Sequence, residues 1–131
     1  MKSTKSSPDS LQMPTVGQLE RELSQKFQAF YREHLGQRPS KVSTQIFGTK
    51  VAIVLEDTIT KPEQLLMHDG KAQLAQKVRE DLHQVLRPKM EVLLESILSV
   101  KVLDILSDSA FDSGRFGVIV ILSEEPNVRQ K

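Results

Sequence analysis

The sequence predicts an α+β protein, in which a four-stranded antiparallel sheet carries an N-terminal helix and a long, proline-kinked helix on one face. Two segments have apolar residues at steps of three and four, the period of an amphipathic helix. Four shorter segments alternate between apolar and polar residues or are wholly apolar, as strands are. Their order is helix, two strands, helix, two strands, which favours helices packed on an antiparallel sheet.

The first helix is expected over about 15–35. Thr15 and Gln18 have the spacing of a capping box, in which each residue satisfies a free backbone N–H of the other. Gly36 suits the left-handed end of a helix, and Pro39 prevents the helix from resuming.

An antiparallel hairpin is expected next, with strands over 41–47 and 51–57. The first strand has one half-polar face, and the second is mostly apolar. Gly48 and Thr49 lie between them, and glycine in first position is typical of a type II′ turn.

A short helix over 63–67 should follow, because Thr60 and Glu63 again have capping-box spacing. A long amphipathic helix over 71–98 comes next and contains Pro88. Proline removes a helical hydrogen bond and clashes with the preceding turn, so the helix either kinks or splits there. We favour the kink, because the apolar stripe keeps its phase across the proline.

The third strand is expected over 99–106, and strict alternation places Val102 and Asp104 on the same face. Residues 107–114 are rich in serine, aspartate and glycine, which indicates a turn.

The fourth strand is expected over 115–123, and its consecutive apolar residues Val118–Leu122 indicate that both of its faces are covered. A homodimer, formed by sheet-on-sheet packing or helix exchange, would provide the second cover. The alternative is a monomer whose kinked helix wraps both sides of the sheet.

The composition of the chain limits the classes of function that it can have. With 131 residues, 38% of them hydrophobic, the chain can form one compact domain. A net charge of +1, no tryptophan and one tyrosine argue against nucleic acid as a partner. The absence of cysteine excludes disulfides, zinc–cysteine sites and a thiol nucleophile.

We expect a disordered polar tail over 1–13, one domain over 14–124 and a second tail over 125–131. The N-terminal segment lacks the apolar stretch of a signal peptide. No apolar run approaches the roughly 20 residues of a membrane helix. The expected location is the cytoplasm, either free or at the periphery of the membrane, and no transmembrane segment is expected.

Several stretches resemble the MpsC-like family of bacterial proteins, which belongs to a sodium-translocating membrane-potential-generating system. They are LGQRPSKV at 35–42, VLEDTITKPEQLL at 54–66, QKVREDLHQVLRPKMEVLLESILSVKVLDILSD at 76–108, and SGRFGVIVIL, which ends at Leu122. Gly36, Arg38 and Pro39 match the family's pattern after its first helix, and the Arg87–Pro88 pair matches its long helix. The turn SAFDSG departs from the threonine-rich turn that is frequent in the family.

The resemblance covers roughly 16–124. It implies a non-enzymatic accessory or regulatory protein of a membrane system for ion or inorganic-carbon (bicarbonate) transport. No catalytic residues are carried over. Because no membrane helix is expected, the chain would not translocate ions itself, and a membrane transport subunit is the expected partner.

The alternative function is a module that binds a small anion, a nucleotide or nucleic acid. Its candidate contacts are Arg38, Arg79, Arg87 and Arg115, which could form an anion pocket. The simpler interpretation is a solvated face, because acidic residues interleave with the basic residues of the long helix.

No catalytic, metal or cofactor site is predicted. The three histidines, His34, His68 and His83, lack the spacing of a helical metal site and are expected to be solvated. His68 and the residue after it are expected to end the short helix. No serine has the frame of a nucleophile elbow, and no glycine-rich phosphate loop is present.

Overall fold

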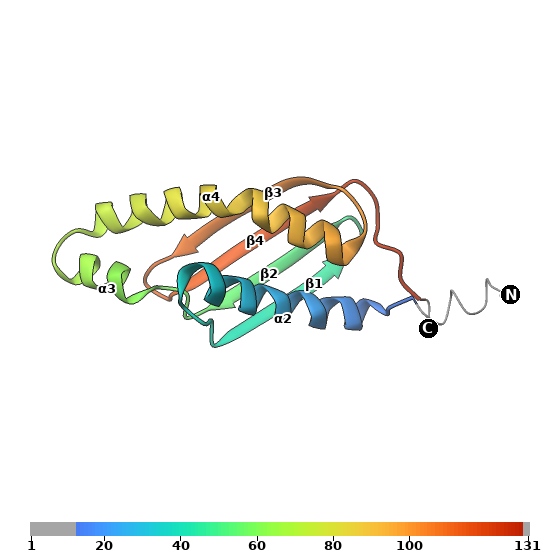
Figure 1. Cartoon of the computed structure of the whole chain (residues 1–131), viewed down its shortest axis with the longest axis horizontal. Helices are drawn as coiled ribbons and strands as arrows, with labels where there is room; N and C mark the ends of the chain where they lie inside the picture. Colours follow the sequence, from blue (N-terminus) through green and yellow to red (C-terminus); the bar gives the residue numbers. More distant parts are fainter. Residues whose placement is uncertain (1–12, 130–131) are drawn as a thin grey trace, which may run out of the picture.

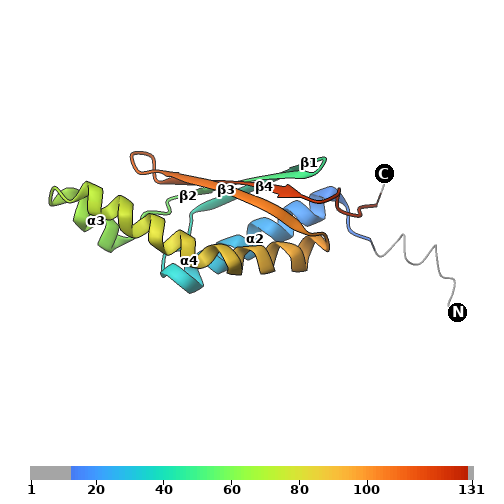
Figure 2. The ribbon, with the colours of Figure 1, turned by 90° about the horizontal axis from the view of Figure 1, so that it is seen from above.

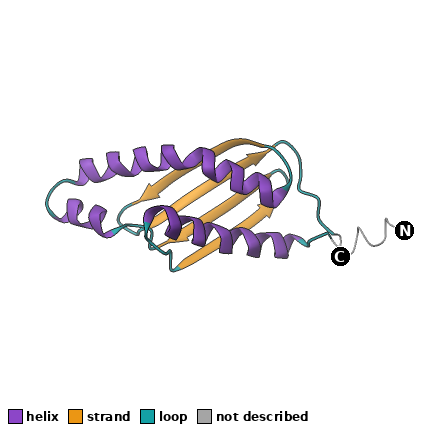
Figure 3. Cartoon of the chain, viewed as in Figure 1, coloured by secondary structure: helices purple, strands orange, loops and turns teal. Residues whose placement is uncertain are grey.

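The computed structural model describes residues 13–129 and confirms the predicted α+β fold (Figures 1 and 3). Residues 1–12 of the expected N-terminal tail and residues 130–131 of the expected C-terminal tail lie outside the described residues. The elements are, in order, α2 (Val16–Leu35), β1 (Lys41–Phe47), β2 (Lys50–Glu56), α3 (Lys61–His68), α4 (Ala72–Leu98), β3 (Val102–Ala110) and β4 (Arg115–Leu122).

The molecule has two layers. The sheet has the order β1-β2-β4-β3, and every neighbouring pair is antiparallel. Figure 2 shows α2 and α4 on the same side of this sheet. The predicted placement of both long helices on one face is therefore confirmed, and the monomer whose long helix wraps both faces is ruled out.

The core lies between the two layers. Residues of β2 and β4 that alternate along the strands point toward the helices, and one stripe from each long helix meets them. The main members are Val51, Ile53 and Leu55 of β2, Phe116, Val118, Val120 and Leu122 of β4, Leu19, Leu23 and Phe27 of α2, and Leu86, Met90, Leu94 and Leu98 of α4.

The helix cap, the helix end and the hairpin turn in the first third of the chain form as predicted. Thr15 and Gln18 form a capping box at the start of α2, and Gly36 ends the helix with a φ of +72°. Phe47 pairs with Lys50 across a two-residue turn, where Gly48 has a φ of +62°. A positive φ at the first turn residue matches the handedness of the hairpin and favours glycine there.

Helix α4 continues through Pro88 as one element, so the split alternative is wrong. Pro88 and Gln84, whose carbonyl loses its helical partner, are both exposed. Water can therefore hydrogen bond to that carbonyl, which lowers the cost of a proline inside the helix.

Strand β3 differs from its prediction. It begins at Val102, ends at Ala110 and extends through the first half of the segment expected to be a turn. A bulge between Val102 and Asp104 shifts the alternation, so Val102 and Ile105 are both buried and Asp104 is exposed. The expected shared face of Val102 and Asp104 is therefore wrong, because one extra residue reverses the side on which later residues point.

The second face of the sheet is uncovered within residues 13–129. Of the run that was expected to be buried on both sides, Val118, Val120 and Leu122 are buried, but Ile119 is 37% exposed. The cover expected for this face is therefore absent from the described chain. No helix of the described part is long and apolar enough to cross a membrane.

The described part of the C-terminal segment is attached to the domain. Pro126 is buried, and Val128 packs against the core. The backbone N–H of Arg129 donates a hydrogen bond of 2.8 Å to the carbonyl of Pro14. The sequence pattern, which predicts a free tail there, does not show this attachment.

Replacing Pro88 with alanine should raise the free energy of unfolding by about 1–2 kcal/mol. The alanine N–H can donate to the carbonyl of Gln84, and position 88 is exposed, so no core contact is lost. Urea unfolding followed by circular dichroism measures the change. Lys89→Ala, at the neighbouring exposed position, should change it by less than about 0.5 kcal/mol. A less stable Pro88→Ala variant would mean that the fold requires proline at this position.

Candidate functional site

A buried arginine lies at the centre of a network of hydrogen-bonded polar side chains. Arg79 of α4 is 3% exposed and forms a two-point ion pair with Glu63 of α3. Nε donates to Glu63 Oε2 at 2.8 Å, and Nη2 donates to Glu63 Oε1 at 2.7 Å. Planar guanidinium and carboxylate groups match in this arrangement, which is among the strongest hydrogen-bonded pairs in proteins.

The other N–H groups of Arg79 also have acceptors. Nη2 donates to the carbonyl of Thr58 at 2.7 Å. Nη1 donates to Tyr31 Oη at 2.9 Å and to Ser109 Oγ at 3.1 Å. A guanidinium has five N–H donors, and these contacts use all of them. We call Arg79, Glu63, Tyr31, Thr58, Ser109 and His83 the Arg79 cluster.

Glu63 is positioned by its own helix start. It is the capping-box residue of α3, and its Oε1 accepts from the N–H and the hydroxyl of Thr60, each at 2.9 Å. Burial would raise the pKa of Glu63, but the hydrogen bonds from Arg79 and Thr60 outweigh burial and hold the pKa below its usual value. The carboxylate therefore stays charged opposite Arg79.

Tyr31 and His83 extend the cluster toward α2 and β4. His83 Nδ1 lies 2.8 Å from the carbonyl of Arg79, so this nitrogen carries the proton. His83 Nε2 then accepts from Tyr31 Oη at 3.2 Å. Burial, together with the charge of Arg79, lowers the pKa of His83. The ring packs on Phe116 with centroids 4.2 Å apart and is neutral near pH 7.

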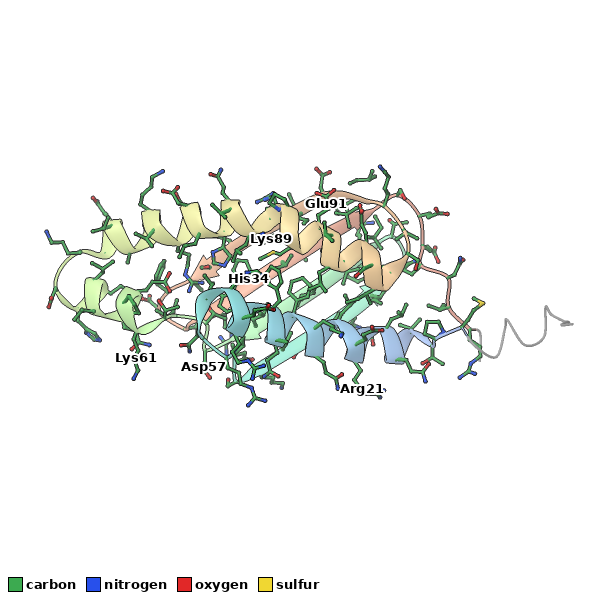
Figure 4. The ribbon with its side chains drawn as sticks, viewed as in Figure 1. Arg21, His34, Asp57, Lys61, Lys89 and Glu91 are labelled. Atoms are coloured by element: carbon green, nitrogen blue, oxygen red, sulfur yellow. The ribbon has the colours of Figure 1, made fainter. Side chains whose placement is uncertain are left out.

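Two cavities flank the cluster at the end of the molecule that holds α3 and the β3–β4 turn. Their volumes are about 360 and 310 Å³, and both are lined by Phe111, whose ring lies under Arg79. The larger is also lined by Asp57, which Figure 4 shows close to the start of α3. The smaller is also lined by Gln76, Glu80, His83, Asp108 and Phe116.

The cluster joins elements rather than presenting free reactive groups. Its members come from α2, α3, α4, β3 and the segment before α3, and its polar atoms bond to one another. The smaller cavity is lined by Arg79, whose charge Glu63 neutralises, and by the acidic residue Glu80, so its charge does not favour an anion. Within residues 13–129 no group of three acidic or histidine side chains could hold a metal ion.

The four candidate arginines have different surroundings. All five N–H donors of Arg79 are used within the cluster. Arg87 is exposed, and its Nη1 donates to the carbonyl of Ile105 at 2.6 Å. Arg115 lies on the uncovered sheet face, 3.5 Å from Glu56, and Arg38 is exposed between α2 and β1. Since Arg79 and Arg115 lie on opposite faces of the sheet, the structure does not bring them together, and an anion pocket stays a prediction.

Sequence analysis missed the cluster, although one signal was present. Arg79 and His83 follow Ala75 at steps of four and precede Leu86, so they continue the buried stripe of α4. A charged residue on the buried face of a helix requires a partner. The expectation that His83 is solvated is wrong, because it packs between Tyr31 and Phe116. His68 does end α3, with Asp69 as its C-cap.

Arg79→Met should lower the free energy of unfolding by about 3–5 kcal/mol, because Glu63 is left buried without a cation. The double variant Arg79→Met/Glu63→Met should recover part of that loss. Lys77→Met removes an exposed cation of the same helix and should cost less than about 1 kcal/mol. Urea unfolding measures all three, and equal effects of Lys77→Met and Arg79→Met would contradict a strong buried pair.

The free energy of unfolding should fall as pH drops from about 7 to about 5.5. Unfolded His83 takes up a proton near its ordinary pKa of 6.5, whereas folded His83 does so only at lower pH. The unfolded state therefore binds more protons across this window. His83→Gln should flatten the slope, and His68→Gln, at an exposed histidine, should leave it unchanged. An unchanged slope in His83→Gln would show that other groups cause it.

Comparison with known proteins gives one match, which spans nearly all of the described domain. The sequence profile of the family described as MpsC, the Na⁺-translocating membrane potential-generating system, matches residues 15–124. No curated protein and no solved structure matches the chain. The matched region runs from the cap of α2 to the end of β4 and includes the whole Arg79 cluster. The chain belongs to the MpsC family.

Proposed function

We propose that this chain is a non-enzymatic accessory or regulatory protein of a membrane ion-transport system. The family match supports the proposal, because the family description names a Na⁺-translocating system that generates a membrane potential. Bicarbonate transport is the other process to which such an accessory protein could belong. The proposed location is the cytoplasm, at the surface of the membrane that holds the transport subunits.

A binding role, rather than catalysis, is supported by the state of the two titratable groups His83 and Glu63 in the Arg79 cluster. A general acid or base needs an accessible proton site within reach of a substrate. Both ring nitrogens of His83 bond to protein atoms, and the carboxylate of Glu63 is engaged by Arg79 and Thr60. These two groups hold the fold together and are not free for acid–base work.

The observation that carries the proposal is an exposed apolar stripe on α4. Val85 and Val92 are 65% and 69% exposed, and Leu74 and Leu82 are also exposed on this helix. Positions 74, 85 and 92 fall on nearly the same side of an α-helix, away from the buried stripe. An amphipathic helix that exposes a second apolar stripe is suited to contact a helix of another protein. We assign this stripe to the membrane subunit.

The proposal predicts that the tagged chain captures a multi-helix ion-transport subunit from gently solubilised membranes of its native cells. Val85→Glu/Val92→Glu should lower the recovery of that subunit at least about tenfold, because two carboxylates must be desolvated in the contact. Gln25→Glu, at an exposed position of α2, should not. Quantitative mass spectrometry of the captured proteins makes the measurement.

A second readout tests the link to ion transport. Cells that lack the chain should build a smaller sodium-dependent membrane potential, measured with a voltage-sensitive dye. The wild-type chain should restore it, and Val85→Glu/Val92→Glu should not. Capture of the chain alone, with an unchanged membrane potential in its absence, would overturn the accessory role.

A further inference from the structure

The uncovered face of the sheet is a second apolar surface, distinct from the stripe on α4. We call it the open sheet face, and the strand pairing gives its composition. Leu106 is 58% exposed and Phe47 is 50% exposed, and the patch between them contains Ala52, Val54, Ile119 and Ile121. Figure 2 shows that both long helices lie on the other side of the sheet.

Charges on the open sheet face are separated by strand. Lys41 on β1 and Lys50 on β2 lie toward one edge, and Asp104 and Asp108 lie on β3 at the other. Lys50 and Asp104 occupy the same row, because each pairs with Ile121 of β4. Between the edges, Glu56 of β2 contacts Arg115 of β4. The β1–β2 half, with two lysines and one glutamate, therefore has a net positive charge, and the β4–β3 half, with one arginine and two aspartates, has a net negative charge.

We propose that a second copy of this chain covers the open sheet face, related by a two-fold axis parallel to the strands. This axis lays β1 of one copy over β3 of the other, so the basic edge meets the acidic edge twice. Lys50 then lies beside the partner's Asp104, and Glu56 lies opposite the partner's Arg115. In the strand register, Lys50 and Asp104 lie in one row across the sheet, and Glu56 and Arg115 lie in another. A two-fold axis parallel to the strands keeps each row opposite the same row of the partner, so it brings these pairs together.

The other face-to-face arrangement, with the axis across the strands, would lay β3 on the partner's β3. It would gather Asp104 and Asp108 of both copies along one strand pair, and like charges brought together in a partly desolvated interface are unfavourable. This axis would also place Lys50 opposite the partner's Glu56, whereas the strand-parallel axis places Lys50 beside the partner's Asp104 and keeps the two β3 strands apart. We therefore favour the strand-parallel axis, and a charge exchange at Lys50 and Asp104 distinguishes the two.

The shape and size of the face suit a second copy. The strand-parallel axis places Val54 opposite the partner's Gly117, above which no atom lies within 4 Å of an added Cβ. Four strands about 4.8 Å apart and about seven residues long cover about 440 Å² of flat area on each copy. The accessible surface of the side chains is larger than this flat area. The total buried by two copies therefore approaches the roughly 1,200 Å² of a small specific interface.

The test uses the purified chain and sedimentation equilibrium at protein concentrations of roughly 10–100 µM. The wild type should be a dimer in this range. Leu106→Glu should raise the dimer dissociation constant at least about tenfold, because it places a carboxylate in the apolar patch. Val92→Glu is the matched control, at an even more exposed apolar position on the helix layer, and should leave the dissociation constant unchanged. Circular dichroism checks that each variant is folded.

A charge exchange tests the arrangement itself. Lys50→Glu and Asp104→Lys should each weaken the dimer about fivefold or more, and the double variant should return toward the wild-type constant. A monomeric wild type overturns the proposal, as does a dimer that Val92→Glu weakens and Leu106→Glu leaves intact. A dimer that the double variant fails to restore overturns the strand-parallel axis. None of these outcomes bears on the accessory role, which membrane-subunit capture and membrane potential measure separately.

Discussion

The buried ion pair between Arg79 and Glu63 is the constraint on which the cavity end of the molecule depends. A charge removed from water is tolerated only when its partners replace the lost hydration. Arg79 finds these partners on α2, α3, β3 and the segment before α3, so those elements must meet at one point. The packing of these elements around Arg79 also forms the two flanking cavities and buries His83, which is why His83 is neutral.

The two-layer fold determines which surfaces are available for contact with other proteins. Because both long helices lie on one face of the sheet, the opposite face keeps its apolar outward residues exposed. The outer side of α4 carries a second apolar stripe that the core does not use. The two surfaces belong to opposite layers, so contact with a second copy and contact with a membrane subunit need not compete.

The arginines show how the same residue type takes different roles in one chain. Arg79 occupies a position in the buried, otherwise mostly apolar stripe of α4. Arg87, two turns later on the same helix, is exposed and donates a hydrogen bond to a carbonyl of β3. Arg115 pairs with Glu56 on the far face of the sheet. Charge alone indicates that each arginine needs a partner, but the partner depends on which elements pack together.

The sequence by itself determined the features that short-range physics controls: the capping boxes at Thr15 and Thr60, the glycine end of α2, the hairpin turn at Gly48, and the burial of one stripe per long helix. Each depends on residues within about four positions of one another. Only the tertiary structure decided the bulge in β3, the partners of Arg79 and the exposure of Ile119. Arg79 and Glu63 are 16 residues apart on different helices. Pairings of this kind are set by how layers pack, because a local pattern shows that a residue is buried without showing what it is buried against.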